Sequence, residues 1–157
     1  MKKETKKKII DIAIISSWVI LGLLLIYYIL CGCRAVLNYD SAFIVDYSLE
    51  QIRTGSIFPN NWCETNDFWI YSLIPFITFF IKCGLGFFQS RQLAALIQGI
   101  VIFILLFRLF YDKKDKNNFL IPGLILVSGI SGQVLLEIFG DATYGTILAC
   151  ILLILDF

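Results

Sequence analysis

Apolar and polar segments alternate along this chain, and the apolar ones are long. Five apolar segments can be counted, at residues 9–31, 68–81, 93–110, 119–136 and 144–155. A run of about 20 apolar residues is long enough to cross the hydrocarbon core of a bilayer as one helix. The pattern therefore predicts an all-α integral membrane protein.

The second apolar segment, 68–81, differs from the others. It has 14 residues before Lys82, with Pro75 in its middle. A segment of about 10–14 apolar residues is more often interfacial or re-entrant than spanning, and a proline inside a helix kinks it. We expect this segment to start and end on the outer side of the membrane. An ordinary short span is the alternative.

The basic residues predict the orientation of the chain. Five lysines precede the first apolar segment, and the break after 93–110 reads RLFYDKKDKNN. Basic loops are retained in the cytoplasm, so both are expected inside, which requires one of the five segments not to cross. With 68–81 kept outside, about four spans remain, at 9–31, 93–110, 119–136 and 144–155. The protein is then expected to be a multi-pass cell-membrane protein with a cytoplasmic N-terminus.

The first span is expected to remain in the protein as an anchor. The apolar region of a cleaved signal peptide has only about 7–15 residues and is followed by a small-residue cleavage site. The apolar run over 9–31 is longer and has no such site after it. It is therefore predicted to be an uncleaved signal anchor.

The polar break after the first span contains a predicted short helix, 41–54. Apolar residues recur at helical spacing, at Ala42, Val45, Leu49 and Ile52, and Gly55 and Pro59 follow as a stop. We expect this helix to lie along the outer membrane surface. Asp40 immediately precedes it, which suits an N-cap, while Asp46 and Glu50 are expected to form an ordinary solvated face.

A second acidic stretch, LLEIFGDATYG, follows the span 119–136 and holds Glu137 and Asp141. In the predicted order it shares the outer face with Asp40. An ionisable group at the edge of the membrane is a functional candidate, although solvation at the end of a span is the simpler interpretation.

Composition agrees with a membrane protein and excludes several functions. Of the 157 residues, 59% are hydrophobic and 16% are charged, and mean hydropathy is +0.83; a soluble domain carries about 25% charged residues. A net charge of +1, with no basic patch interleaved with aromatics, gives no indication of nucleic-acid binding. The chain has no histidine, which excludes Ser-His-Asp and Cys-His nucleophiles and His-ligated zinc within it.

The order of these features resembles the GT-C superfamily of membrane glycosyltransferases, in its aminoarabinose-transferase and protein-mannosyltransferase-like branch. Members begin with a signal-anchor span and an outer loop in which an acidic residue opens a juxtamembrane helix, here NYDSAFIVDYSLEQIRTGSIFPNNW. A second juxtamembrane segment with a proline follows, here WIYSLIPFITFFIKCGLGFFQSRQLAALIQG, and Arg91 matches the arginine after its turn. A span, a basic loop, another span and a second outer acid, Asp141, complete the order.

This resemblance implies that a sugar is transferred, with inversion, from a polyprenyl-phosphate carrier to an acceptor on the outer face. It implies a catalytic role for Asp40, and for Asp141 with Glu137. It also implies a divalent metal held by Asp40 and Asp141 in some members. Arg91 or Lys82 would contact the carrier phosphate, and arginine is the better bidentate donor.

The chain departs from the family in length and in one motif. Family enzymes have many more spans, so we interpret the chain as an N-terminal fragment, inactive alone, whose C-terminal half or partner subunit is missing. The lysine-proline pair of aminoarabinose transferases is replaced by NDFW, so that sugar is not supported. The alternative function is a small non-catalytic multi-span membrane protein, such as a lipid-sugar flippase accessory or an assembly subunit.

Overall fold

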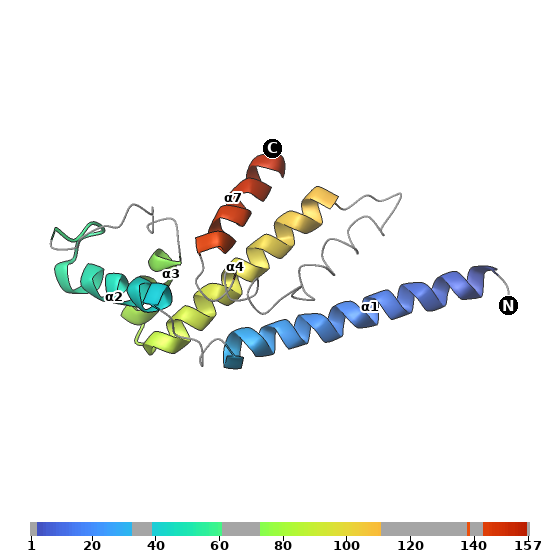
Figure 1. The fold of residues 1–157 in the computed structure, drawn as a ribbon, viewed down its shortest axis with the longest axis horizontal. Helices are drawn as coiled ribbons and strands as arrows, with labels where there is room; N and C mark the ends of the chain where they lie inside the picture. Colours follow the sequence, from blue (N-terminus) through green and yellow to red (C-terminus); the bar gives the residue numbers. More distant parts are fainter. Residues whose placement is uncertain (1–2, 33–38, 61–72, 111–137, 139–142, 157) are drawn as a thin grey trace.

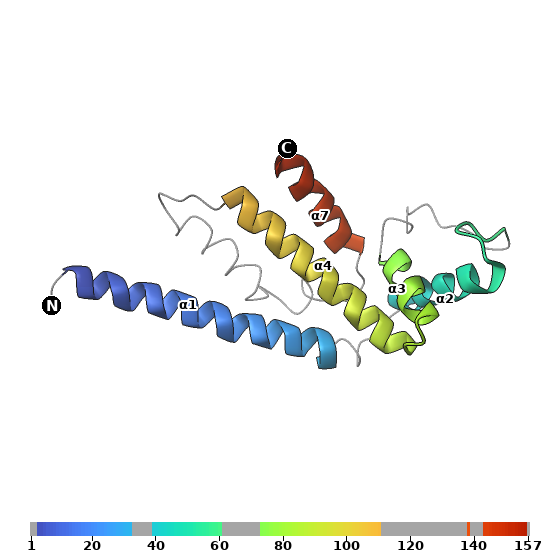
Figure 2. The ribbon, with the colours of Figure 1, turned by 180° about the vertical axis from the view of Figure 1, so that it is seen from behind.

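The structure, a computed structural model, describes residues 3–32, 39–60, 73–110, 138 and 143–156. Within these residues it contains helices and no strands. The helices are α1 (Lys3–Tyr27) with a π-helical end, η1 (Tyr28–Gly32), then α2 (Tyr39–Thr54), α3 (Ile74–Lys82), α4 (Phe87–Phe110) and α7 (Thr143–Asp156). Figures 1 and 2 show α2 and α3 gathered at one end of α4. The all-helical prediction is thus confirmed for the described part of the chain.

Two of the described helices are long and apolar enough to cross a membrane. They cover Lys8–Cys31 and Phe87–Phe110, with 24 residues each, or about 36 Å at the rise of an α-helix. The second begins earlier than the predicted span 93–110, because polar residues of its first turns are buried by packing. The predicted span 144–155 corresponds to the shorter helix α7, and 119–136 lies outside the described residues.

The helices α1 and α4 run in opposite directions. The Trp18 and Phe103 rings meet edge to face at 4.7 Å, and the Gln92 side chain donates to the Leu30 carbonyl. High numbers on α1 therefore lie beside low numbers on α4. It follows that the chain leaves α1 and enters α4 at the same end of the pair, where α2 and α3 also lie (Figure 1).

The helices α4 and α7 run in the same direction. The Gln98 amide contacts Thr146 at 3.2 Å, and further along both helices the Arg108 guanidinium lies 2.8 Å from the Asp156 carboxylate. Apolar packing between these contacts is centred on Ile102 and Leu152. The two helices therefore point toward the same end of the molecule, which is opposite to the end that holds α2 and α3.

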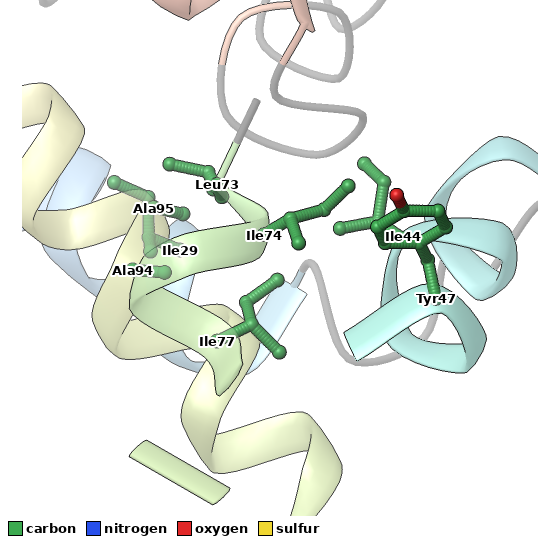
Figure 3. Close-up of a cluster of buried hydrophobic side chains, with 8 residues drawn as sticks. All are labelled: Ile29, Ile44, Tyr47, Leu73, Ile74, Ile77, Ala94 and Ala95. Carbon is green, nitrogen blue, oxygen red and sulfur yellow. The ribbon is translucent and has the colours of Figure 1, made fainter. Parts of the chain in front are cut away.

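The main core lies where α3 separates α2 from α4. Ile74 and Ile77 of α3 are completely buried. Figure 3 shows them between α2 on one side and α4 with the end of α1 on the other. Their neighbours in this core are Ile29, Ile44, Tyr47, Leu73, Ala94 and Ala95. Burying one such isoleucine stabilises a fold by about 1.5–3 kcal/mol. Because these side chains fill the space between α2 and α4, α3 fixes the distance between those two helices.

Pro75 lies in the first turn of α3 rather than inside a helix. At that position the missing N–H group has no helical partner to lose and the fixed φ suits the helix. The expected kink in the middle of 68–81 is therefore wrong. Residues 68–72 lie outside the described part of the chain.

The helices α3 and α4 are joined by a tight turn at Gly84. This residue has φ +90°, a backbone conformation that favours glycine. Its N–H group donates to the Ile81 carbonyl, and the next N–H group, of Leu85, donates to the Phe80 carbonyl. These bonds satisfy carbonyl groups that the helix end leaves free, so the direction of α4 relative to α3 is set by local hydrogen bonds.

Candidate functional site

A small pocket lies between α2 and the first turns of α4. Its volume is about 160 Å³, the space of about five water molecules at the ~30 Å³ that each occupies in the liquid. The α2 wall consists of Ala42, Val45 and Asp46, and the α4 wall of Phe87, Phe88 and Arg91. The surface of the pocket is almost wholly apolar, so Asp46 and Arg91 border it mainly through the carbon atoms of their side chains.

The α2 wall follows from helical spacing. Ala42, Val45 and Asp46 are three and four residues apart, and residues at these spacings lie on one face of a helix. The face that packs against α3 is a different one, with Ile44, Tyr47 and Gln51 buried. Of the apolar face that was predicted to lie on the membrane surface, Val45 is buried and Ala42, Leu49 and Ile52 are half-buried, and its contact with lipid stays a prediction.

The buried face of α2 was missed because part of it is polar. Gln51 donates from Nε2 to the Ile57 carbonyl at 2.8 Å and accepts at Oε1 from the Thr78 hydroxyl at 2.7 Å. The Ser48 hydroxyl donates to the Ile44 carbonyl at 2.8 Å. Buried polar groups are tolerated when they are hydrogen-bonded, so a count of apolar residues does not show that this face is buried.

Arg91 is the charged residue that the structure places most deeply. Only 5% of its surface is exposed, beside the fully buried Ser90. A guanidinium presents five N–H donors in a planar fork that matches phosphate or carboxylate oxygens. A buried arginine in a pocket wall at the end of an apolar helix is therefore a candidate anion-binding group, as the sequence predicted for Arg91.

Asp40 lies in the first turn of α2, which begins at Tyr39. The Asp40 side chain lies outside what the structure describes, so its role as an N-cap stays a prediction. A carboxylate in this turn is still favourable, since the helix dipole places partial positive charge there. Asp40 is two positions before Ala42, the first residue of the pocket wall.

The other predicted site residues are not at the pocket. Lys82 is exposed in the last turn of α3 and is absent from the pocket walls. Glu137 and Asp141 lie outside the described residues. A metal site formed by Asp40 and Asp141 therefore stays a prediction; among the described residues, no group of three metal-ligating side chains is found.

Two further acids on α2 have different surroundings. Glu50 accepts two hydrogen bonds from Arg53, and these bonds hold the pKa of its carboxyl below the ordinary value. Glu50 thus belongs to a surface ion pair. Asp46 is exposed, as predicted for a solvated helix face, and it also borders the pocket, across from Arg91.

A larger pocket, of about 450 Å³, lies between α1 and α4. Apolar side chains form its walls, among them Trp18, Ile29, Leu96 and Phe103, and Gly22 leaves open space beside it. It offers no charged group that could bind a polar substrate. The α2–α4 pocket is therefore the better candidate for chemistry.

The fold defines this chain as an all-helical protein with two helices long and apolar enough to cross a membrane. Comparison with family models, curated proteins and solved structures finds no match. A function is therefore argued from the residues of the pocket and from the order of the sequence motifs.

Proposed function

We propose that the chain belongs to a membrane glycosyltransferase that moves a sugar from a polyprenyl-phosphate carrier to an acceptor on the outer face. The observation that carries this proposal is the burial of Arg91 near the start of α4, an apolar helix long enough to cross a membrane, beside a small pocket. A carrier lipid has an apolar tail and an anionic head, so its phosphate must be bound near the end of a membrane helix.

The directions of the helices support the outer location. Helix α2 lies at the end of the α1–α4 pair where α1 ends and α4 begins (Figures 1 and 2), and the pocket is lined by α2 and the first turns of α4. The lysines at the start of α1, and Phe110, which the basic segment follows in the sequence, lie at the opposite end. Since basic segments are retained in the cytoplasm, the pocket faces outward.

The proposed reaction needs an anion-binding group and a base. The acceptor hydroxyl attacks the anomeric carbon of the sugar, and the bond from that carbon to the carrier phosphate oxygen breaks with the electron pair leaving on the phosphate. Arg91 donates to the phosphate and stabilises this charge. Asp40 takes the acceptor proton as general base, and Asp141 with Glu137 completes the acidic set. A divalent metal at Asp40 and Asp141 would further stabilise the leaving phosphate.

The test is binding of a short-chain polyprenyl phosphate to the purified chain in lipid nanodiscs. We expect saturable binding that Arg91→Gln weakens by about tenfold to a hundredfold, the size of a lost charged hydrogen bond. Arg91→Lys should retain part of the binding, because the lysine ammonium keeps the positive charge but loses the planar set of donors of the guanidinium. The matched control is Arg53→Gln, since Arg53 is exposed and paired with Glu50.

Helix content and thermal stability of each variant separate lost binding from lost folding. Absence of saturable binding to the wild-type chain would contradict the proposal and favour a non-catalytic multi-span protein. A folded Arg91→Gln chain that binds the lipid with the affinity of the wild-type chain would contradict the proposal as well. In an enzyme completed by its remaining spans, Asp40→Asn and Asp141→Asn should both abolish transfer.

A further inference from the structure

We infer that the start of α1 is a binding surface for anionic phospholipids, and that its lysines bind the negatively charged headgroups of the leaflet beside it. The lysines concerned are Lys3, Lys6, Lys7 and Lys8, and residues 3–8 are called the basic start of α1. This surface lies at the opposite end of the α1–α4 pair from the α2–α4 pocket, so it is independent of the proposed reaction.

The first argument is the charge of the basic start of α1. It holds four lysines and one acid, Glu4. Lys3 lies three residues before Lys6 and four before Lys7, so these lysines share one face of the helix, where like charges repel. The start of a helix also carries partial positive charge, which is unfavourable for lysine. A bound anion offsets both effects, so this end of the helix favours a negatively charged ligand.

The second argument is how far α1 extends. Together α1 and η1 cover residues 3–32, with 25 and 5 residues, or about 45 Å, against about 30 Å for the hydrocarbon core of a bilayer. The antiparallel contacts of α1 with α4 place Phe110, the last residue of α4, level with about residue 12 of α1. Figures 1 and 2 show the start of α1 reaching beyond the ends of α4 and α7. In a bilayer the basic start of α1 would therefore lie at the level of the headgroups.

The third argument is that lipid can reach this end of α1. Lys8 is exposed, and Ile9 and Ile12, which follow it, are 53% and 64% exposed. A phospholipid presents a headgroup above apolar tails, and α1 presents lysine before exposed isoleucine in the same order. Arg108, near the end of α4, differs because it is paired with Asp156 at 2.8 Å. The lysines therefore form the cationic part of this surface.

The experiment measures which lipids contact the whole chain in phosphatidylcholine vesicles, by electron paramagnetic resonance of spin-labelled phosphatidylglycerol or phosphatidylcholine. Each basic residue near the surface attracts anionic lipid by about fivefold. The signal averages all lipid around the chain, so we expect a preference of about threefold for phosphatidylglycerol, falling as salt is raised. Both leaflets have the same composition, so the result does not depend on how the chain is oriented in the vesicle.

Replacing the four lysines by glutamine should remove most of this preference, because glutamine keeps the helix propensity and loses the charge. Replacing them by arginine is the matched control and should retain the preference. Arg53→Gln is the control for position, because Arg53 is exposed on α2 and paired with Glu50. Helix content of each variant shows that it has folded.

Three outcomes would overturn the inference. The first is a wild-type chain that does not prefer the anionic lipid. The second is a folded glutamine variant that keeps the full preference. The third is an equal loss in the arginine variant or in Arg53→Gln, which would show that these lysines are not the binding surface. None of these outcomes affects the proposed function, whose test uses a polyprenyl phosphate and Arg91.

Discussion

At the scale of single residues, the Gln98 amide joins α4 to α7 through its oxygen and to Ile138, which precedes α7, through its nitrogen. Its Nε2 donates to the Ile138 carbonyl at 2.8 Å and its Oε1 accepts from the Thr146 hydroxyl at 3.2 Å. Gly145 of α7 faces this amide, and a Cβ added there would collide with Gln98 and with the Ile138 carbonyl. Small residues at such contacts let membrane helices approach closely.

Gly145→Ala should therefore destabilise the protein. In an open helix the change from glycine to alanine is favourable by about 1 kcal/mol, but overpacking costs about 1–3 kcal/mol. Gly22→Ala is the control, because a Cβ at Gly22 meets nothing within 4 Å. We expect a lower free energy of unfolding for the first variant and an equal or higher one for the second, measured by denaturant titration in detergent. A stabilised Gly145→Ala would contradict the packing described.

Arg91 and Asp46 differ in how far their positions in the structure could be predicted from the sequence. Arg91 was named in advance through the resemblance to a family motif; the structure shows it buried beside the pocket, and its role stays a prediction. The place of Asp46 at the same pocket could not be predicted, because the path of α3 and the turn at Gly84 bring Phe87 and Phe88 of the other wall from a distant segment. A pocket between distant segments leaves no spacing pattern in either one.

At the scale of helices, the presence of α2 and α4 could be predicted from the sequence, but the faces on which they pack could not. The range 41–54 matches α2 closely and Gly55 follows its end. However, its buried face contains Ser48 and Gln51, whose hydrogen bonds make burial favourable and whose polarity hides them from a count of apolar residues. The start of α4 was placed too late for the same reason, since Ser90 and Arg91 are buried.

The contact between Arg108 and Asp156 joins the ends of α4 and α7. Asp156 is in an otherwise apolar helix, and the 2.8 Å contact supplies a partner for its charge. We expect a double-mutant cycle of Arg108→Gln and Asp156→Asn to give a coupling energy of about 0.5–1 kcal/mol, since Arg108 is exposed. Additive effects in detergent unfolding would show that the pair does not stabilise the helix contact.

At the scale of the whole molecule, the directions of the helices bear on whether segment 68–81 crosses the membrane, which its length alone left open. The chain leaves α1 and enters α4 at one end of the pair, with α2 and α3 between them (Figure 1). This arrangement favours a segment 68–81 that begins and ends on one side. The sequence reached the same interpretation from charge, because basic residues precede α1 and follow α4.

Labelling of single cysteines tests this arrangement. Cys83, exposed in the turn between α3 and α4, should react with a membrane-impermeant maleimide on intact cells. Asn117→Cys, in the basic segment after α4, should react only after the membrane is permeabilised. Cys150, exposed on the apolar helix α7, is the control for burial in lipid and should resist the reagent in both conditions. Labelling of Asn117→Cys from outside would contradict the orientation.

The position of α3 has a consequence for how this pocket can change. Its two walls belong to α2 and α4. The distance between these helices depends on Ile74 and Ile77 of α3, which pack between them and do not line the pocket (Figure 3). Exchanging these side chains for smaller or larger ones would move the walls together or apart while every lining residue stays the same. Two chains with identical pockets in sequence could thus accept ligands of different size.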